Sequence, residues 1–271
     1  MKKLIKFGAM ALTMGMFIYS CEKENVNSTK NTSHSNNNIV EDLHQIFNEI
    51  QGEEDNVNAK SSSNLSVPLA NKQNPFDNDG LQHNEVLSYI MSLGLDESNV
   101  CSSLGLVSKE FQVKIDLSCN ELISLINDGS SKTFDDERNY KSVLLNDLLN
   151  RGNISENEFQ VVNTTIEKVY NLTNLNQKIT LLKASENYTR NSQFLTDIEK
   201  ERIQRTFAIY RYSSFYWEVD AIELAAGPGA SAADALMYYW ALNSEYSPAQ
   251  DGKDAYAIAG AVSAAFVILG F

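Results

Sequence analysis

From Asn74 to the last residue, apolar side chains recur at helical spacing, and this periodicity constrains the fold more than any other feature. No stretch alternates apolar and polar residues over the length of a strand, and only four prolines interrupt the 271 residues. The pattern predicts an all-α fold, an irregular helical bundle over residues 74–271. The predicted helices are Gln82–Leu93, Ser108–Asn127, Asp135–Arg151, Glu156–Leu172, Leu175–Arg190, Thr196–Val219, Ala230–Leu242 and Asp254–Leu269.

Short polar signals mark where several of these helices begin or end. Ser155 and Thr196 each precede a first turn rich in acidic residues, so both side chains are placed to accept a backbone N–H there. Arg151-Gly152 is a helix stop, since glycine readily adopts the left-handed conformation that often follows the last helical residue. These signals predict separate helices joined by short connections.

The first 20 residues have the pattern of a bacterial export signal. A start carrying three lysines is followed by an uncharged, mostly apolar run over residues 7–19, which is too short for a comfortable membrane span. The segment closes on Ile18-Tyr19-Ser20-Cys21, which resembles the lipobox of bacterial lipoproteins, where the Cys takes a diacylglyceryl group before cleavage. The sequence predicts a signal peptide at residues 1–20 and lipidation at Cys21, and two or more acyl chains give stable anchoring.

Residues 21–73 have the composition of a flexible tether. Asn25–Asn38 and Gly52–Asn64 are too polar to bury enough apolar surface to offset the entropy lost on ordering. Between them, Ile39, Leu43 and Phe47 fall on one face of a short amphipathic helix. This helix can dock on the domain or remain a separate satellite, and the sequence leaves both open.

The chain is strongly acidic, with a formal net charge of −13. Removal of the predicted signal peptide takes away Lys2, Lys3 and Lys6 and no acid, which leaves 19 basic against 35 acidic residues. Such a surface repels nucleic acid, and no basic stripe offsets it. The predicted partner is a membrane, reached through the lipid anchor; a protein or small-molecule partner is left open.

Asn74–Glu85 is the densest polar cluster in the chain. With Gly80 at the sixth position of an EF-hand calcium loop, the first position is Pro75 and the twelfth is Val86, and neither can bind calcium through its side chain. A turn that caps the following helix needs only local backbone bonds from Asp and Asn, so the turn is favoured and no metal site is predicted. The residues in this cluster that still have metal-ligand chemistry are Asp77, Asp79, His83 and Glu85.

Residues 207–217 are rich in aromatic side chains. Phe207, Tyr210 and Trp217 share one helix face with Ser214, while other aromatic residues lie on different faces. This distribution favours a central core helix over a groove lined for a ligand. Acids that follow the segment have the chemistry of a glycosidase acid and base, but helical acids beside aromatic residues are too common to identify a catalytic pair. These acids are Glu218, Asp220 and Glu223.

The C-terminal residues 255–271 carry no charge, and Ala257, Ala261 and Ala265 repeat every four residues beside Gly260. Small residues at this spacing let helices approach closely, as in membrane helix pairs. An all-apolar helix is equally typical of the centre of a bundle, and the run is slightly short for a span. Burial in the bundle is favoured, and membrane insertion remains the alternative.

The remaining cysteines, Cys101 and Cys119, either form a disulfide in an exported protein or lie buried as small apolar residues, and the sequence does not decide. The chain has no paired-cysteine zinc spacing, no His-Glu-X-X-His, no Gly-X-Ser-X-Gly and no phosphate loop. Only His83 of three histidines lies in the predicted domain, which argues against a His-dependent triad. No catalytic residue, metal ligand or cofactor is predicted.

Several of these segments, taken with the lipobox, resemble a group of uncharacterised Bacteroidetes lipoproteins. They are Asn74-Pro75-Phe76-Asp77, His83-Asn84, Tyr212–Trp217 and the Gly/Ala-rich C-terminal tail. The resemblance spans most of the chain and implies a place in the cell envelope, at the outer membrane, without implying any activity. Glu22-Lys23-Glu24 also resembles the charged signal that sorts some Bacteroidetes lipoproteins to the cell surface, so the face of the membrane stays open.

Three functions therefore compete. The leading hypothesis is a non-enzymatic, lipid-anchored envelope protein with a helical binding or interaction domain of unknown ligand. The first alternative is a membrane-active effector of bacteriocin or toxin type that inserts its apolar C-terminal helix. The second is an acid/base hydrolase that uses Glu218 and Asp220, which requires both carboxylates in one cleft open to solvent.

Overall fold

The computed structural model describes residues 32–54, 66–124, 143–220, 227–243 and 252–268, and the described residues from Thr32 onward belong to one compact unit. The predicted signal peptide, Cys21 and the start of the tether lie outside the described residues. Within them every regular element is a helix, which confirms the predicted all-α fold. The elements are α1 (Thr32–Glu54), α2 (Asp77–Ser92), α3 (Ser102–Phe111), α5 (Val143–Asn150), α6 (Glu156–Tyr170), α7 (Leu175–Asn191), α8 (Asp197–Phe215), the π-helical turn η1 (Tyr216–Asp220), α9 (Gly227–Leu242) and α10 (Lys253–Ile268).

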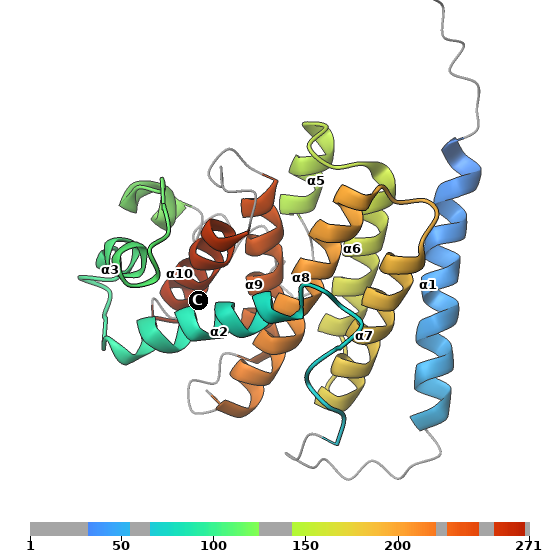
Figure 1. Cartoon of the computed structure of the whole chain (residues 1–271), viewed down its shortest axis with the longest axis horizontal. Helices are drawn as coiled ribbons and strands as arrows, with labels where there is room; N and C mark the ends of the chain where they lie inside the picture. The colour runs from blue at the N-terminus through green and yellow to red at the C-terminus, as the bar shows by residue number, and fades with distance from the viewer. Residues whose placement is uncertain (1–31, 55–65, 125–142, 221–226, 244–251, 269–271) are drawn as a thin grey trace, which may run out of the picture. The chain divides into compact units, whose positions relative to one another are not determined.

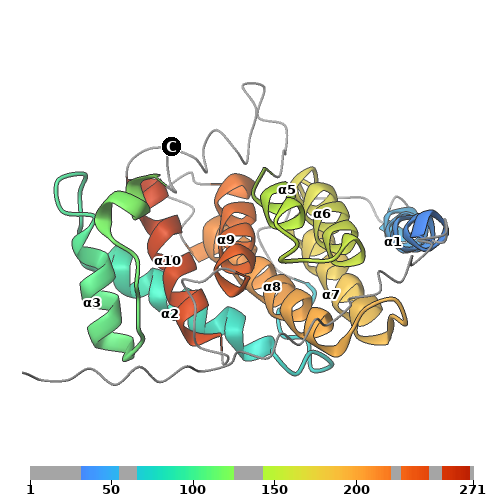
Figure 2. The ribbon, with the colours of Figure 1, turned by 90° about the horizontal axis from the view of Figure 1, so that it is seen from above.

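Helix α8 is the centre of the arrangement, with α2, α7 and α9 packed around it (Figures 1 and 2). Eight of the nine residues from Ile203 to Arg211 are buried, so the helix has no solvent face over this stretch. Phe207, Tyr210 and Trp217 are buried as well. A helix buried on all sides needs neighbours on all sides, and the prediction of a central core helix for the aromatic segment is confirmed.

The predicted caps form. Ser155 accepts a hydrogen bond from the backbone N–H of Glu158, and Thr196 forms a reciprocal capping box with Glu199. Helix α5 ends before Gly152, whose φ of 71° is the left-handed conformation expected at a helix stop. Most helix ends after Asn150 therefore fall within a few residues of the predicted ones.

One predicted helix is wrong. Ser108–Asn127 is not continuous, because α3 ends at Phe111 and Gln112 takes a left-handed φ of 53°. An extended stretch follows, in which Val113 and Leu117 are buried, and helix resumes at residue 119. A disulfide between Cys101 and Cys119 joins the beginning of α3 to the resumed helix, which resolves the open question of those cysteines.

The amphipathic helix within the predicted tether docks on the bundle. Ile39, Leu43 and Phe47 of α1 are fully buried, and α1 packs against α6 and α7 on the side opposite α3 (Figures 1 and 2). The three side chains lie four residues apart, so one stripe of the helix makes the contact. The compact unit thus includes α1 and the segment before residue 74.

The apolar C-terminal helix is buried. Ala257, Ala261 and Ala265 are fully covered, and α10 packs against α2, α3 and α9. A Cβ added to Gly260 would lie 2.8 Å from Val86 Cγ1, so the glycine permits the close approach of α10 to α2. Within the described residues, none of the helices combines the length and hydropathy that a membrane crossing requires.

Candidate functional site

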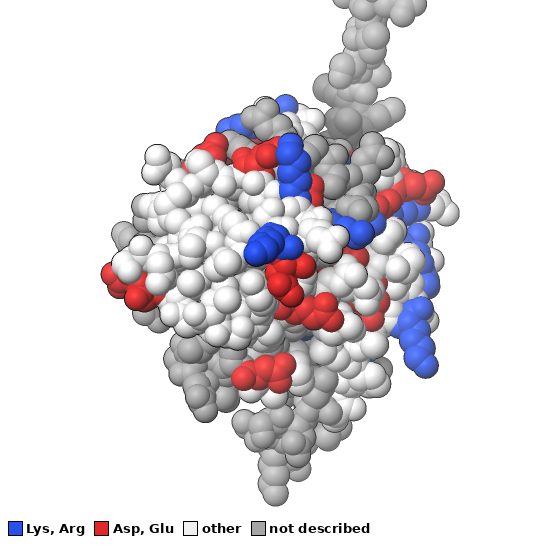
Figure 3. All heavy atoms as spheres, turned by 60° about the vertical axis from the view of Figure 1, so that its left-hand side comes forward, with Lys and Arg blue, Asp and Glu red and all other residues white. Residues whose placement is uncertain are grey.

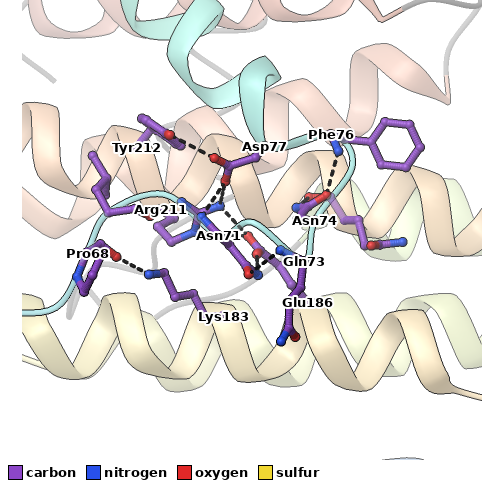
Figure 4. A network of polar contacts seen from close by, with 12 residues as sticks. Pro68, Asn71, Gln73, Asn74, Phe76, Asp77, Lys183, Glu186, Arg211 and Tyr212 are labelled. Atoms are coloured by element: carbon purple, nitrogen blue, oxygen red, sulfur yellow. Dashed lines mark hydrogen bonds and ion pairs between the residues drawn. The ribbon is translucent and has the colours of Figure 1, made fainter.

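A non-helical segment of bends and turns, Ser66–Phe76, crosses α7 and α8 and is held there by side chains that bind its backbone (Figure 4). We call it the strap. Asn176 Oδ1 accepts from the backbone N–H groups of strap residues 66 and 67 at 2.8 and 3.2 Å. Lys183 donates to the carbonyl of Pro68, and Arg190 Nη1 donates to that of Gln73 at 3.0 Å. These three α7 side chains lie seven residues apart, on one helix face.

Arg211 is the buried centre beneath the strap (Figure 4). Its guanidinium binds Glu186 from α7 at 3.0 Å, and it also binds Asp77 and the carbonyl of Leu69. Burial alone lowers the pKa of Arg211, but the two carboxylates outweigh it and raise that pKa, so the group stays charged. Burial raises the pKa of Glu186. Five donors in a planar fork suit arginine for joining α8, α7 and the strap at once.

The polar residues at the start of α2 also bind side chains of other helices. Asp77 accepts from Tyr212 Oη at 3.1 Å as well as from Arg211, and Asp79 pairs with Arg205 and accepts from Tyr238 Oη at 3.1 Å. Burial raises the pKa of Asp79, even though the charge of Arg205 opposes this. This part of the predicted polar cluster holds α2 against α8 and α9.

The four metal-ligand candidates of that cluster do not converge. Asp77 and Asp79 pair with different arginines, Glu85 is exposed, and His83 is fully buried beside Asp234. Among the residues that the structure describes, no group of three His, Cys, Asp or Glu side chains is placed to hold a metal ion. The local turn that the sequence favours does form: Asn74 accepts the backbone N–H groups of Phe76 and Asp77, and Asp77 Oδ1 accepts that of residue 71. The predicted side-chain cap does not form, because the N-cap residue of α2 is Phe76, which has no side-chain acceptor.

A second buried cluster joins three helices at positions that no sequence motif marks. Asp234 of α9 accepts from Trp217 Nε1 at 2.7 Å and from the hydroxyl of Ser213, and its other oxygen lies 3.6 Å from His83 Nε2. All these side chains are buried. A Ser, a His and an Asp therefore meet, and these are the residue types of a serine triad, which needs a single histidine.

The order of contacts in this cluster does not suit nucleophilic catalysis. In a serine triad the imidazole lies between the hydroxyl and the carboxylate, so that it can take the proton from the hydroxyl. Here Asp234 lies between Ser213 and His83, and none of the three is open to solvent. The cluster links α2, α8 and α9 in the core. Periodicity alone cannot find it, because Ser213 and Asp234 occupy ordinary helical positions.

The acids proposed for a hydrolase are placed separately. Glu218 pairs with Lys178, whose side chain is almost fully buried, and this pair ties η1 to α7. Asp220 is exposed at the end of η1, although partial desolvation of its carboxylate raises its pKa. Glu223 lies outside the described residues. The structure thus gives Glu218 a structural partner and shows no shared cleft for the two described acids.

Among the described residues, a groove of about 560 Å³ between α1 and α7 is open to solvent. We call it the α1–α7 groove. Its lining includes Asp42, Asn187, Tyr188, Asn191, Gln193 and Phe194. Tyr188 Oη donates to Asp42 Oδ2 at 3.4 Å across it, and burial together with the Asp42 charge raises the pKa of Tyr188 to about 12. Sequence reasoning missed this site, because it placed Asp42 in a tether.

Comparison with protein-family models, with curated proteins and with solved structures finds no match for the chain. The function therefore has to be inferred from the chemistry of the chain's own sites.

Proposed function

We propose that the chain is a lipid-anchored protein of the cell envelope, held at the outer membrane through Cys21, whose helical unit binds a ligand or partner without catalysis. The anchor is supported by the basic start, the short apolar run and the lipobox-like Ile18–Cys21. A chain so tethered presents its folded unit at a membrane surface.

One observation carries the binding role: the ionisable clusters are sealed or internally paired, whereas the α1–α7 groove is open. Arg211, Asp234 and His83 are fully buried, and each contacts other parts of the chain. The groove is lined by amides, the Asp42 carboxylate, the Ser192 hydroxyl, two aromatic rings and two aliphatic side chains, and its lining includes no histidine or cysteine. Such a lining can recognise a molecule, but it has no histidine to activate the hydroxyl as a nucleophile.

Burial of α10 bears on the effector alternative. For that function the helix would have to leave α2, α3 and α9, exposing a run of small apolar side chains that are now covered. The binding role requires no such rearrangement, and it is therefore preferred.

Metabolic labelling with an alkyne analogue of palmitate tests the anchor. The full chain expressed in a bacterial host should carry the label and partition into the detergent phase on Triton X-114 separation. The C21S variant should lose the label, because a hydroxyl is a far poorer nucleophile than a thiolate. The matched control is the C101S/C119S double variant, which should keep the label, since those cysteines form a disulfide. Label retained in C21S would reject the anchor.

A further inference from the structure

The α1–α7 groove has the volume of a small-molecule site, and its lining combines apolar surface with several polar groups. Its volume of about 560 Å³ lies within the range of ligand pockets, roughly 300–1,000 Å³. As in such pockets, apolar surface predominates, with Ile46 and Ala184 beside the two aromatic rings. The polar groups are the amides of Asn187, Asn191 and Gln193, the Ser192 hydroxyl and the Asp42 carboxylate. A ligand that fits must therefore combine hydrogen-bonding groups with an apolar face.

The charges that line the groove further limit the class of ligand that can bind there. Its lining residues include no Lys, Arg or His, so nothing there compensates a phosphate, sulfate or carboxylate group. An amide side chain both donates and accepts hydrogen bonds, as does a hydroxyl group. Three amides beside one acceptor thus match a neutral ligand with several hydroxyl groups.

Two aromatic rings give the groove an apolar side. Phe194 is 39% exposed, although phenylalanine is usually buried, and Tyr188 lies with it in the lining. The negatively charged face of an aromatic ring attracts the slightly positive C–H groups of a partner. The flat face of a pyranose ring carries such C–H groups while its rim carries hydroxyls, so a sugar satisfies rings and amides together.

The loop that carries Phe194 is held in place before any ligand arrives. The backbone N–H of Phe194 donates to Ser192 Oγ at 3.2 Å, and its carbonyl accepts from Asn157 Nδ2 at 3.0 Å. Leu195 is buried and Thr196 begins the capping box of α8. A fixed loop spends little entropy on binding, which makes an exposed ring an effective contact.

Tyr188 is placed to support a hydroxylated ligand. Its phenol is protonated at neutral pH, as an ordinary tyrosine is, so it can donate a hydrogen bond to a ligand. The 3.4 Å bond to Asp42 Oδ2 is long, and a ligand hydroxyl can replace either partner at small cost.

We infer that the α1–α7 groove binds a neutral saccharide, with a sugar face on Phe194 and hydroxyls on Asn187, Asn191 and Asp42. This rests on the proposed binding function and gives it a ligand class. Phe194 and the amides come from α7 and the loop after it, while Asp42 comes from α1.

Titration calorimetry on the full chain in detergent tests the inference. The probes are neutral hexasaccharides of α-linked glucose, β-linked glucose, mannose and xylose, with a sulfated hexasaccharide and an oligolysine as charged probes. At least one neutral probe should bind with a Kd of about 1 mM or tighter, and F194A should weaken it about tenfold or more. D42N should change it by about threefold or less, since the amide keeps an acceptor oxygen.

The matched control is I198A, which removes a side chain that is 67% exposed but does not line the groove. Its affinity should equal that of the unmodified chain, and both alanine variants should keep the unmodified melting temperature. Equal losses in F194A and I198A, binding of charged probes alone, or no neutral binding would each overturn the inference.

The two proposals fail separately. Labelled Cys21 with no saccharide binding rejects the ligand class and leaves the anchored protein standing. Saccharide binding in a chain that never takes the palmitate label rejects the anchor and supports the groove.

Discussion

The two sides of α8 are built on different principles. Toward α6, α7 and the strap, the contacts are charged: Arg202 pairs with Glu158, and Arg211 pairs with Glu186. On the other side, α9 contributes the buried Asp234 cluster together with several alanines. Beyond it, α10 packs on α9 and α2, and its buried surface consists mainly of small residues, with Gly260 where α10 approaches α2. The face of the molecule near α3 likewise shows few charged side chains (Figure 3).

The difference shows how the helix packing is determined on each side. A buried arginine has a small number of correct partners, so the charged side fixes which helices meet and in what register. Packing of small residues fixes how closely the helices meet, and it responds to the volume of single atoms. The charged side should therefore fail when a partner is removed, and the small-residue side when an atom is added.

Removal of Arg211 should give the largest effect. R211M leaves Glu186 buried without a compensating charge, so the free energy of unfolding should fall by about 3–5 kcal/mol in urea denaturation. R190M removes an exposed arginine that also binds the strap backbone, and it should cost about 1 kcal/mol or less. A small loss in R211M would mean that the charged cluster does not specify this side.

Loss of the disulfide should have the second-largest effect. It probes the region around α3, where the described residues form no buried ion pair. Cys101 and Cys119 are 18 residues apart, and a closed loop of this length stabilises by about 3 kcal/mol. Reduction should lower the unfolding midpoint of the unmodified chain, whereas the C101S/C119S variant should show the same lowered midpoint with or without reductant. An unchanged midpoint on reduction would show that contacts alone hold α3.

A single added methyl group should break the small-residue side. G260A places a Cβ 2.8 Å from the stiff, fully buried side chain of Val86, so it should cost about 1–3 kcal/mol. G105A is the matched control: nothing lies within 4 Å of its added Cβ in α3, so it should stabilise by about 0.5–1 kcal/mol. Because V86A removes the atoms that the added Cβ would strike, it should destabilise G260A less than it destabilises the unmodified chain. Additive effects in this double-mutant cycle would place the strain elsewhere.

The helices were predictable because their information is local. Apolar spacing and the caps at Ser155 and Thr196 act within one or two turns, so the sequence alone was enough to place α6, α7 and α8. The break at Gln112 was not predictable, because its cause is tertiary: Val113 and Leu117 are buried by other helices and a disulfide closes the loop.

The candidate site was missed for a related reason. Asp42 lies in a segment whose flanks are polar, and nothing local shows that it meets Tyr188, which is 146 residues away. The cluster of Ser213, Asp234 and His83 likewise depends on how three helices cross. What the sequence did show was the type of residue available, including the absence of cysteine or histidine motifs for catalysis.

The most gradual expected effect is a pH dependence of the stability that belongs to the charged side. Burial raises the pKa of both Glu186 and Glu158 above the ordinary value of 4.5. A carboxyl with a raised pKa in the folded state binds its proton more tightly there than in the unfolded chain. Its contribution to stability is therefore complete below pH 4.5 and is lost as the pH rises through the folded-state pKa.

The free energy of unfolding should thus fall as the pH is raised from 5 to 8, by at most about 1.4 kcal/mol per pH unit for each proton released. Urea denaturation at each pH measures it. E186Q should flatten this dependence, because the amide does not titrate, whereas E110Q, at an exposed position on α3, should leave its slope unchanged. Self-repulsion in a chain of net charge −13 acts in the same direction but affects both variants alike. Equal slopes in E186Q and E110Q would therefore assign the pH dependence to overall charge, and the two sides of α8 would not differ in this respect.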